Sequence, residues 1–312
     1  MIKGSLVPNI TFFDIDGDIE KEKTGWHIRW MLEKGVDGLF LTGSYGLGPM
    51  MTNEERIEIF KLAKEVASKF SGKILLPHVG CIDTKSTVEL AKVADKIGVT
   101  GIGAVPPFYY KHSEKLVIQY YKDIIENVNT PVYAYNNPGT SRFTFSFETI
   151  QKLQELGLKG LKDTPLNVGF ISRVSYDAKV NNKDFQFITG TSIGWLPLYY
   201  MGVRATIAGM NNWAPEIITT LIKATFEGNT ERAEKAYLVM MDLSTKMHFT
   251  ESTIASHMGL YARGFNAGFP RKPMFLPPFD DPKYKEIRGW LEQGFTELGL
   301  EMETGSDTTV GV

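Results

Sequence analysis

Eight short apolar segments rich in β-forming residues recur along the first two thirds of the chain, with helical patterns between them. These expected strands are residues 5–7, 38–41, 74–76, 101–105, 132–135, 158–162, 185–188 and 205–208. Strands separated by helices pair in parallel through right-handed crossovers. Eight such units in about 220 residues predict an α/β fold, a closed (β/α)₈ barrel. An open doubly wound sheet is the alternative, but the glycine-rich segment 43–48 lacks the dinucleotide-binding spacing.

The helical segments between the strands carry recognisable start signals. Thr52 is a capping residue followed by Glu54 and Glu55, and apolar residues then lie mainly on one face. Residues 113–125 and 146–156 open in a similar way. These signals support the alternation of strands and helices.

The strand pattern stops after Pro215. Four further segments have helical patterns, namely residues 217–227, 230–246, 250–262 and 282–298. An irregular connection at 264–281 precedes the last of them. We therefore predict a barrel domain over residues 1–226, which carries the chemistry, and a C-terminal helical region over residues 227–312.

The composition excludes several classes of protein. A formal net charge of −2 provides no broad basic surface for nucleic acid or an anionic membrane. The single cysteine, Cys81, has no partner for an internal disulfide, which favours a reducing compartment. The start of the chain lacks the apolar core of a signal peptide, and no apolar run reaches membrane-spanning length. We therefore expect a cytoplasmic protein.

Lys162 ends the expected strand 158–162 and is followed by a polar loop. Burial disfavours the ammonium form and lowers the pKa, and a lysine that loses its proton can attack a carbonyl to form an imine. For a lysine considered alone, a side chain that extends from the strand end to water is the more common case. Whether Lys162 is a buried reactive amine or extends to water therefore has to be judged from the residues expected near it.

Other polar features follow the ends of three further expected strands. The segment 42–48 is rich in glycine and hydroxyl residues, so that backbone N–H groups around Gly43 and Ser44 could converge on a small carboxylate. Tyr135 and Tyr109 end two further strands, and a tyrosine bridged by a hydroxyl can carry protons. Because strand ends of a barrel share one mouth, Lys162, Tyr135 and Ser44 are expected to meet there.

The same motifs carry a family resemblance over nearly the whole chain. Segments 43–46, 135–138, 160–164 and 207–215 resemble the pyruvate-dependent class I aldolase family that includes dihydrodipicolinate synthase and N-acetylneuraminate lyase. Segments 46–49, 107–110 and 269–273 are most similar to the archaeal-type 2-keto-3-deoxygluconate aldolases. The resemblance implies a lyase that joins or separates pyruvate and an aldehyde.

The resemblance also implies roles for individual residues. Lys162 would form the imine with pyruvate, and Tyr135 would shuttle protons. Ser44 would link Tyr135 to Tyr109, which in the family crosses from a neighbouring subunit. The backbone at Ser44 and Tyr45 would bind the pyruvate carboxylate, with Gly43 beside them, and Ile207 would line the pocket. No metal or organic cofactor would be required, and the partners would be small molecules and further copies of the chain in a homotetramer or dimer.

Two positions depart from the family pattern. Thr140 stands where dihydrodipicolinate synthases carry an arginine that holds a substrate carboxylate, and Arg142 lies two residues further on. Tyr45 replaces a small hydroxyl residue of many relatives and would narrow the second-substrate pocket. The favoured substrate is a 2-keto-3-deoxy sugar acid. The alternatives are 4-hydroxy-tetrahydrodipicolinate synthase, N-acetylneuraminate lyase, a hydratase-aldolase, and a keto-acid-binding regulator without turnover.

Other polar and aromatic residues suggest no second site. A metal site is not expected, because no metal-ligand spacing is found among the histidines His27, His78, His112, His248 and His257. Cys81 is expected to fill apolar space rather than act as a nucleophile, and Trp195 is expected to pack in the core or against another subunit.

Overall fold

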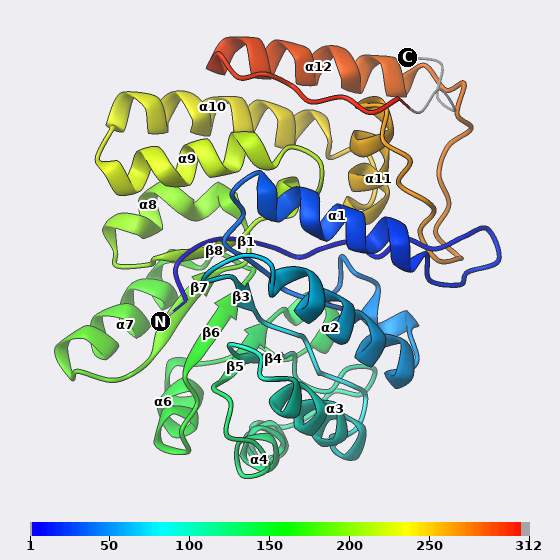
Figure 1. The fold of residues 1–312 in the computed structure, drawn as a ribbon. Coiled ribbons are helices and arrows are strands. Elements are labelled where there is room, and N and C mark those ends of the chain that lie inside the picture. The colour runs from blue at the N-terminus through cyan, green and yellow to red at the C-terminus, as the bar shows by residue number, and fades with distance from the viewer. Residues whose placement is uncertain (1, 307–312) are drawn as a thin grey trace.

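The strands form one parallel barrel sheet. The computed structural model describes residues 2–306. Its strands are β1 (Gly4–Val7), β2 (Gly38–Leu39), β3 (Ile74–Leu75), β4 (Ile102–Ala104), β5 (Val132–Asn136), β6 (Gly160–Asp163), β7 (Gln186–Thr189) and β8 (Ala205–Ile207). They pair in parallel in the order β3-β2-β1-β8-β7-β6-β5-β4, and a bridge between His78 and Gly103 joins the two ends. The predicted (β/α)₈ barrel is confirmed (Figure 1).

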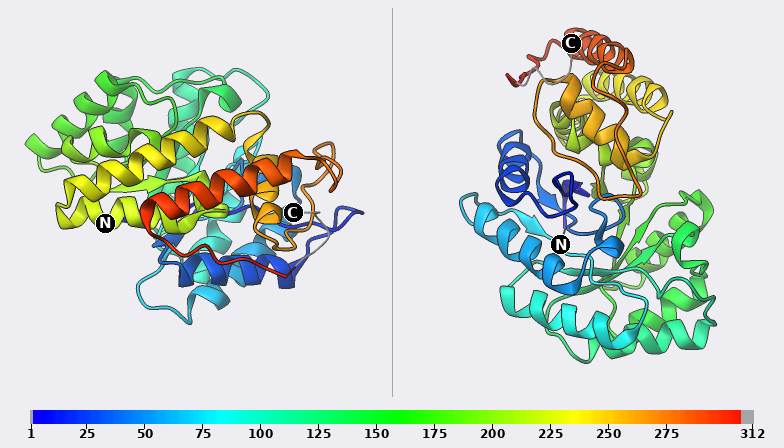
Figure 2. Two further views of the ribbon diagram at one scale, coloured as in Figure 1. Left: turned by 90° about the horizontal axis from the view of Figure 1, so that it is seen from above. Right: turned by 90° about the vertical axis from the view of Figure 1, so that its right-hand side faces the viewer.

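Helices surround this sheet, one or more after each strand (Figures 1 and 2). They are α1 (Lys21–Glu33), α2 (Asn53–Ala67), α3 (Thr84–Ile97), α4 (Glu114–Ile125), the short α5 (Pro138–Ser141), α6 (Phe147–Glu155), α7 (Val168–Val180), α8 (Trp195–Tyr200) and α9 (Pro215–Glu227). The predicted start of α2 is a capping box in which Thr52 and Glu55 each bond the other's backbone N–H. The capping serine of α6, Ser146, accepts from the N–H of Thr149.

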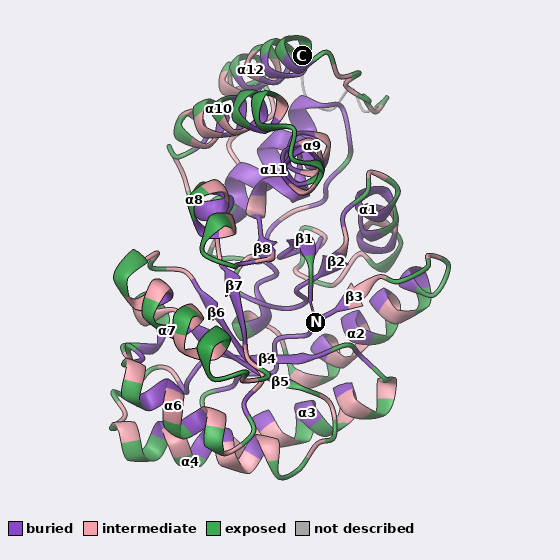
Figure 3. Cartoon of the chain, turned by 90° about the vertical axis from the view of Figure 1, so that its left-hand side faces the viewer, coloured by how far each residue is buried: buried purple, intermediate pink, exposed green. Residues whose placement is uncertain are grey.

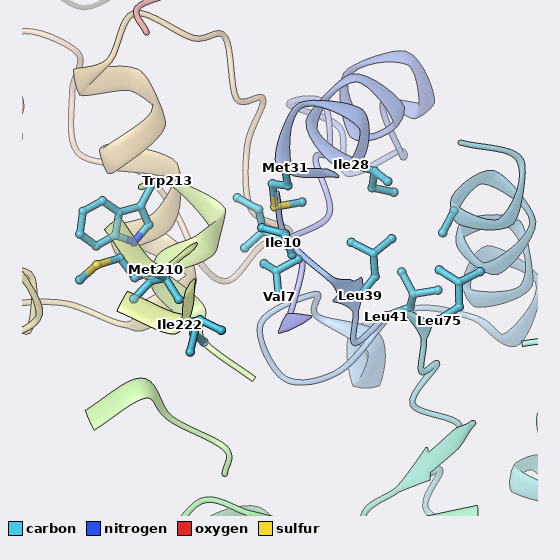
Figure 4. Close-up of a cluster of buried hydrophobic side chains, with 14 of the residues drawn as sticks. Val7, Ile10, Ile28, Met31, Leu39, Leu41, Leu75, Met210, Trp213 and Ile222 are labelled. Atoms are coloured by element: carbon cyan, nitrogen blue, oxygen red, sulfur yellow. The ribbon is translucent and has the colours of Figure 1, made fainter. Parts of the chain in front are cut away.

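Strand alternation divides the apolar residues into two cores. Val7, Leu39 and Leu75 point outward to the helices, where Ile28 and Met31 of α1 pack near them (Figure 4). The inner cluster fills the barrel and consists of Ile2, Leu6, Phe40, Leu76, Val105, Tyr133, Tyr135, Ile188, Ala205 and Ile207. Each strand therefore sends every second side chain into the barrel. A polar residue at an inward position near a strand's carboxyl end must lie among these apolar side chains.

The remaining helices stack beyond α9. They are α10 (Thr230–Lys246), α11 (Ser252–Ala262) and α12 (Lys283–Leu298), with an irregular segment before α12 as predicted. Figure 3 shows that α11 is buried along most of its length. Arg263, fully buried, donates to Glu216 of α9 and to the carbonyl oxygen of Glu303. The boundary near residue 227 falls between α9 and α10, but the division into two domains stays a prediction. Residues 307–312 of the predicted C-terminal region lie outside the described residues.

Two residues that the sequence analysis considered, Trp195 and Cys81, are buried. Trp195 is fully buried, and its indole N–H donates to Thr225. Cys81 is a buried free cysteine. Among the helices of residues 2–306, none combines the length and apolar character that crossing a membrane requires.

Two buried histidines predict acid sensitivity of the fold. Burial lowers the pKa of His27 to about 4 and that of His257 to about 3. The unfolded chain takes up these protons as the pH falls through about 6.5, whereas the folded chain does not, so stability is lost below pH 6.5. We expect the free energy of unfolding to fall by about 2 kcal/mol per histidine between pH 7 and pH 5.

Denaturant unfolding at both pH values measures this loss. His27 and His257 each bond a backbone carbonyl through one ring nitrogen, which His27→Gln and His257→Asn can imitate. The double variant should show a flatter pH dependence, whereas exposed His248→Gln should not change it. An equally steep loss in the double variant would contradict the assignment.

Candidate active site

Lys162 lies inside the barrel, on β6. The residue before it, Leu161, faces the helices, so alternation turns Lys162 inward. Its neighbours in register are Tyr135 of β5 and Ile188 of β7, and both belong to the inner cluster. Lys162 is only 4% exposed. The buried lysine that the sequence predicted is therefore present, and its side chain does not extend to water.

Two aromatic rings hold the Lys162 amine. Nζ lies 3.8 Å from the ring centroid of Phe40 and 3.8 Å from that of Tyr135. Burial lowers the pKa of Lys162, and interaction with Tyr135 opposes this shift in part. A lowered pKa increases the neutral fraction of the amine near neutral pH. The amine is thus prepared for attack on a carbonyl carbon.

The Tyr135 hydroxyl lies within a network of polar groups. Thr164 Oγ1 lies 3.5 Å from it and Asn137 Nδ2 lies 3.2 Å from it, both as donors. The side chains of Ser44 and Lys162 also hydrogen-bond Tyr135. Burial by itself would raise the Tyr135 pKa, but Lys162 and these hydrogen bonds outweigh it and the pKa is lowered. The predicted meeting of Lys162, Tyr135 and Ser44 is present in this chain, and a tyrosine so placed can accept and return a proton.

The loop after β2 offers backbone donors beside this network. Within residues 2–306, no hydrogen bond inside the protein uses the backbone N–H groups of Gly43, Ser44 and Tyr45. Only glycine fits at position 43, because a Cβ there would lie 2.6 Å from the Phe40 ring. The loop can thus present N–H groups to a small carboxylate next to the Lys162 amine.

The Tyr45 side chain turns toward β8 and α11. Its ring lies against the backbone of Gly209, where a Cβ would come within 2.6 Å of a ring carbon. Its side chain hydrogen-bonds Ser252, and its carbonyl oxygen accepts from Thr253 at 3.3 Å. Burial raises the pKa of Tyr45, which keeps the phenol protonated. Ile207, two residues before Gly209, is fully buried in the inner cluster.

Three other expected positions lie outside this network. Tyr109 is 74% exposed, has a φ of 83°, and packs edge-on against Tyr110. Thr140 is exposed in α5 and donates to the carbonyl oxygen of Asn137 at 3.0 Å. Arg142 is exposed as well. The chain thus brings neither Tyr109 nor Arg142 to its own Lys162.

Three site residues were not identified from the sequence. Phe40 appears in the sequence as one apolar residue of a buried strand, and nothing marks it as a face for an amine. Thr164 and Asn137 belong to the quoted motifs, but no role was given to them. Thr164 and Asn137 follow Lys162 and Tyr135 by two residues. Their position just after two strand ends could have marked them as residues of the barrel mouth.

Acidic residues near the site are engaged in structure. Asp163 accepts from Asn136 Nδ2 at 2.6 Å and from the N–H of Leu166 at 3.1 Å. Burial raises the pKa of Asp163 despite these bonds. Among the described residues there is no group of three or more His, Cys, Asp or Glu side chains suited to a metal ion.

Known proteins are similar to this chain over nearly its whole length. The model of the dihydrodipicolinate synthetase family matches residues 1–293. The 2-dehydro-3-deoxy-phosphogluconate/2-dehydro-3-deoxy-6-phosphogalactonate aldolase of Saccharolobus solfataricus is 28% identical over 285 residues, 90% of this chain and 92% of that protein. The 4-hydroxy-tetrahydrodipicolinate synthase of Persephonella marina is 28% identical over 291 residues, 92% of this chain and 97% of that protein.

A solved structure is similar to this chain in its fold. A variant of the 2-keto-3-deoxygluconate aldolase of Sulfolobus solfataricus superposes with a TM-score of 0.83 at 27% identity. The match covers 95% of this chain and 97% of that one. The (β/α)₈ architecture with its C-terminal helices is therefore shared.

Proposed function

Since this chain belongs to the dihydrodipicolinate synthetase family of pyruvate-dependent class I lyases, we propose that it cleaves and forms the carbon–carbon bond of a 2-keto-3-deoxy sugar acid such as 2-keto-3-deoxygluconate. One observation carries the mechanism: the buried amine of Lys162 lies between the rings of Phe40 and Tyr135. The structural similarity to the 2-keto-3-deoxygluconate aldolase of Sulfolobus solfataricus supports the choice of substrate.

The proposed reaction begins at the Lys162 nitrogen. The neutral amine attacks the keto carbon, and water leaves with a proton that the Tyr135 hydroxyl gives up, which yields a protonated imine and a Tyr135 phenolate. When the C3–C4 bond breaks, the C4 hydroxyl gives its proton to the Tyr135 oxygen and the aldehyde leaves. The bonding electrons move through the enamine to the imine nitrogen. The Tyr135 hydroxyl then protonates C3 of the enamine. Water hydrolyses the resulting imine, which releases pyruvate and the neutral amine, and the proton set free returns to Tyr135. The scheme requires neither a metal nor an organic cofactor.

Residues beside Lys162 are proposed to bind the carboxylate of the substrate. The backbone N–H groups of Gly43, Ser44 and Tyr45 bind the keto acid carboxylate in this proposal, and Ile207 lines the pocket below it. Thr140, which is exposed on α5, is proposed to contact the incoming aldehyde. The chain acts on small molecules rather than nucleic acid or membrane. Its single cysteine fits a cytoplasmic location.

Steady-state kinetics distinguishes the substrates. Pyruvate release from 2-keto-3-deoxygluconate should exceed release from N-acetylneuraminate, and condensation of pyruvate with aspartate semialdehyde should be slower still. Thr140 has no charge with which to hold the carboxylate of aspartate semialdehyde, and Arg142 is exposed outside the Lys162 network, so this chain lacks a carboxylate clamp of its own. Preference for aspartate semialdehyde would replace the proposal by the synthase reaction. An imine with pyruvate and no turnover of any aldehyde would indicate a keto-acid-binding regulator.

Tyr45 should limit the size of the aldehyde. Its ring is held against Gly209 and hydrogen-bonds Ser252, and in this proposal it bounds the aldehyde side of the pocket. We expect Tyr45→Thr to raise the use of N-acetylmannosamine relative to glyceraldehyde by about tenfold or more, the scale on which pocket size discriminates substrates. Tyr45→Phe, which keeps the ring, should leave this ratio near that of the wild type. An unchanged ratio in Tyr45→Thr would show that the ring does not bound the aldehyde site.

Tyr109 is proposed to act in a neighbouring copy of the chain. The Tyr109 side chain is exposed in this chain, and its backbone has a positive φ, which is a strained conformation. Neither feature serves the Lys162 site of the same chain. Sedimentation should give a homotetramer or a dimer. Co-expressed Lys162→Met and Tyr109→Ala chains, each inactive alone, should regain activity in up to about a quarter of the sites, as random pairing of two protomers requires. Failure to regain any activity in mixed oligomers would contradict the crossing.

A further inference from the structure

His78 lies where the barrel closes. It follows β3, and its backbone forms the bridge to Gly103 of β4. Its N–H donates to the carbonyl oxygen of Leu41 at 2.9 Å, and its own carbonyl oxygen accepts from Thr42 and from Arg56 of α2. The residue is 2% exposed. Its backbone is therefore held from β2, β4 and α2 at once.

Hydrogen bonding fixes the imidazole in one neutral tautomer. The backbone N–H of Val105 donates to His78 Nε2 at 3.1 Å. Because a backbone N–H can only donate, Nε2 accepts here and the ring proton of the neutral imidazole is on Nδ1. The ring also hydrogen-bonds the backbone of Thr42. Arg56 Nη2 lies 3.5 Å from Nδ1, but a guanidinium N–H can only donate and so is not the acceptor of this proton. A second proton would have to break the Val105 bond and would add charge beside a guanidinium.

The charged and titratable neighbours act in the same direction. Burial, then Arg56, then Lys162 hold the pKa of His78 well below its ordinary value. Arg56 is itself buried and donates to the carbonyl oxygens of His78 and Gly80 and to Cys81 Sγ, which are neutral acceptors. Burial raises the pKa of the Cys81 thiol, so it stays protonated. His78 thus remains uncharged while Lys162 gains and loses protons.

The imidazole packs on the two rings that hold the Lys162 amine. Its ring centroid lies 5.8 Å from that of Phe40 and 6.1 Å from that of Tyr135, with interplanar angles of 53° and 89°. Phe40 and Tyr135 also meet edge to face, with centroids 5.7 Å apart. Both rings therefore have His78 as a common support, on the side of α2.

We propose that His78 is a positioning residue of this active site, a permanently neutral imidazole that keeps the rings of Phe40 and Tyr135 closed around the Lys162 amine. The proposal rests on the imine mechanism proposed above. Closed rings keep water from the amine and hold the Tyr135 hydroxyl in reach of the substrate. Arg56 supports the imidazole from behind and opposes its protonation.

Two substitutions separate the ring from the hydrogen bond. His78→Gln keeps an acceptor for the Val105 N–H but removes the ring. His78→Phe keeps a ring but leaves that N–H without its acceptor. The readout is the rate of pyruvate trapping by borohydride as a function of pH, with kcat and thermal melting measured on the same samples. The imine rate rises with pH as Lys162 loses its proton.

The proposal predicts a different result for each variant. In His78→Gln, water reaches the Lys162 amine and raises its pKa. The acid limb of the trapping profile should therefore move to higher pH by roughly one unit, which makes the trapping rate about tenfold lower at neutral pH. Its kcat should fall by about tenfold or more, because Tyr135 is less well placed. His78→Phe should melt earlier but keep an acid limb close to that of the wild type.

Three outcomes would overturn the inference. They are an unchanged acid limb and kcat in His78→Gln, losses that only follow the fraction of unfolded protein, and a shift found in His78→Phe but not in His78→Gln. Wild-type protein is trapped first in each series. If pyruvate does not label the wild type, the imine mechanism itself fails, and the two failures are thereby distinguished.

Discussion

Replacing Lys162 by methionine abolishes turnover, by more than about four orders of magnitude in kcat, the scale on which loss of a covalent nucleophile acts. The amine is the only group of the site that can form the imine, and its neighbours Phe40 and Tyr135 cannot substitute for it. Methionine keeps most of the volume of the buried stem, and removing a buried amine leaves no unpaired charge. We therefore expect the fold and its melting temperature to be retained. Initial rates of pyruvate release measure the effect.

Lys159 provides the matched control. It lies three residues earlier in the chain, and its Nζ pairs with Asp184 at 2.7 Å on an exposed surface. Lys159→Met should leave kcat unchanged, because an exposed ion pair contributes little. Activity above about one ten-thousandth of wild type in Lys162→Met would exceed the residual rate expected after loss of the nucleophile and would contradict the imine mechanism.

Replacing Tyr135 by phenylalanine slows turnover by about two to four orders of magnitude, the usual effect of losing a positioned acid–base group. The ring and its contact with the Lys162 amine remain, but the hydroxyl that Thr164, Asn137 and Ser44 hold is lost. Because the amine itself is intact, pyruvate should still be trapped by borohydride. Single-turnover kinetics separates imine formation from bond cleavage.

Tyr133 is the control for this substitution. It lies two residues earlier on β5, faces the same inner cluster, and burial raises its pKa to about 12. Tyr133→Phe should therefore keep wild-type kcat. If Tyr135→Phe and Tyr133→Phe had similar rates, the hydroxyl of Tyr135 would have no part in proton transfer.

Strand periodicity explains why much of the site is predictable from the sequence. Lys162 and Tyr135 each end a β-rich run, and parallel neighbours in a barrel present their carboxyl ends at one mouth. The observed register places the two residues directly opposite each other. The loop at Gly43 was recognisable from its glycines, because a tight turn that leaves backbone N–H groups free generally requires glycine.

The remaining parts depend on contacts between distant residues. Phe40 and His78 resemble ordinary core residues in the sequence, and their role appears only when two strand ends and α2 converge on Lys162. The position of the Tyr45 ring depends on Gly209, which is distant in the chain. Tyr109 is exposed in this chain, so its proposed role depends on a second copy.

Intact-protein mass after incubation with pyruvate and borohydride, followed by peptide mapping, tests most directly whether Lys162 forms the imine. We expect one reduced pyruvyl adduct per chain, on the peptide that contains Lys162, and none in Lys162→Met. An unlabelled chain, under conditions that fully label a known imine aldolase, or an adduct on another lysine would contradict this assignment.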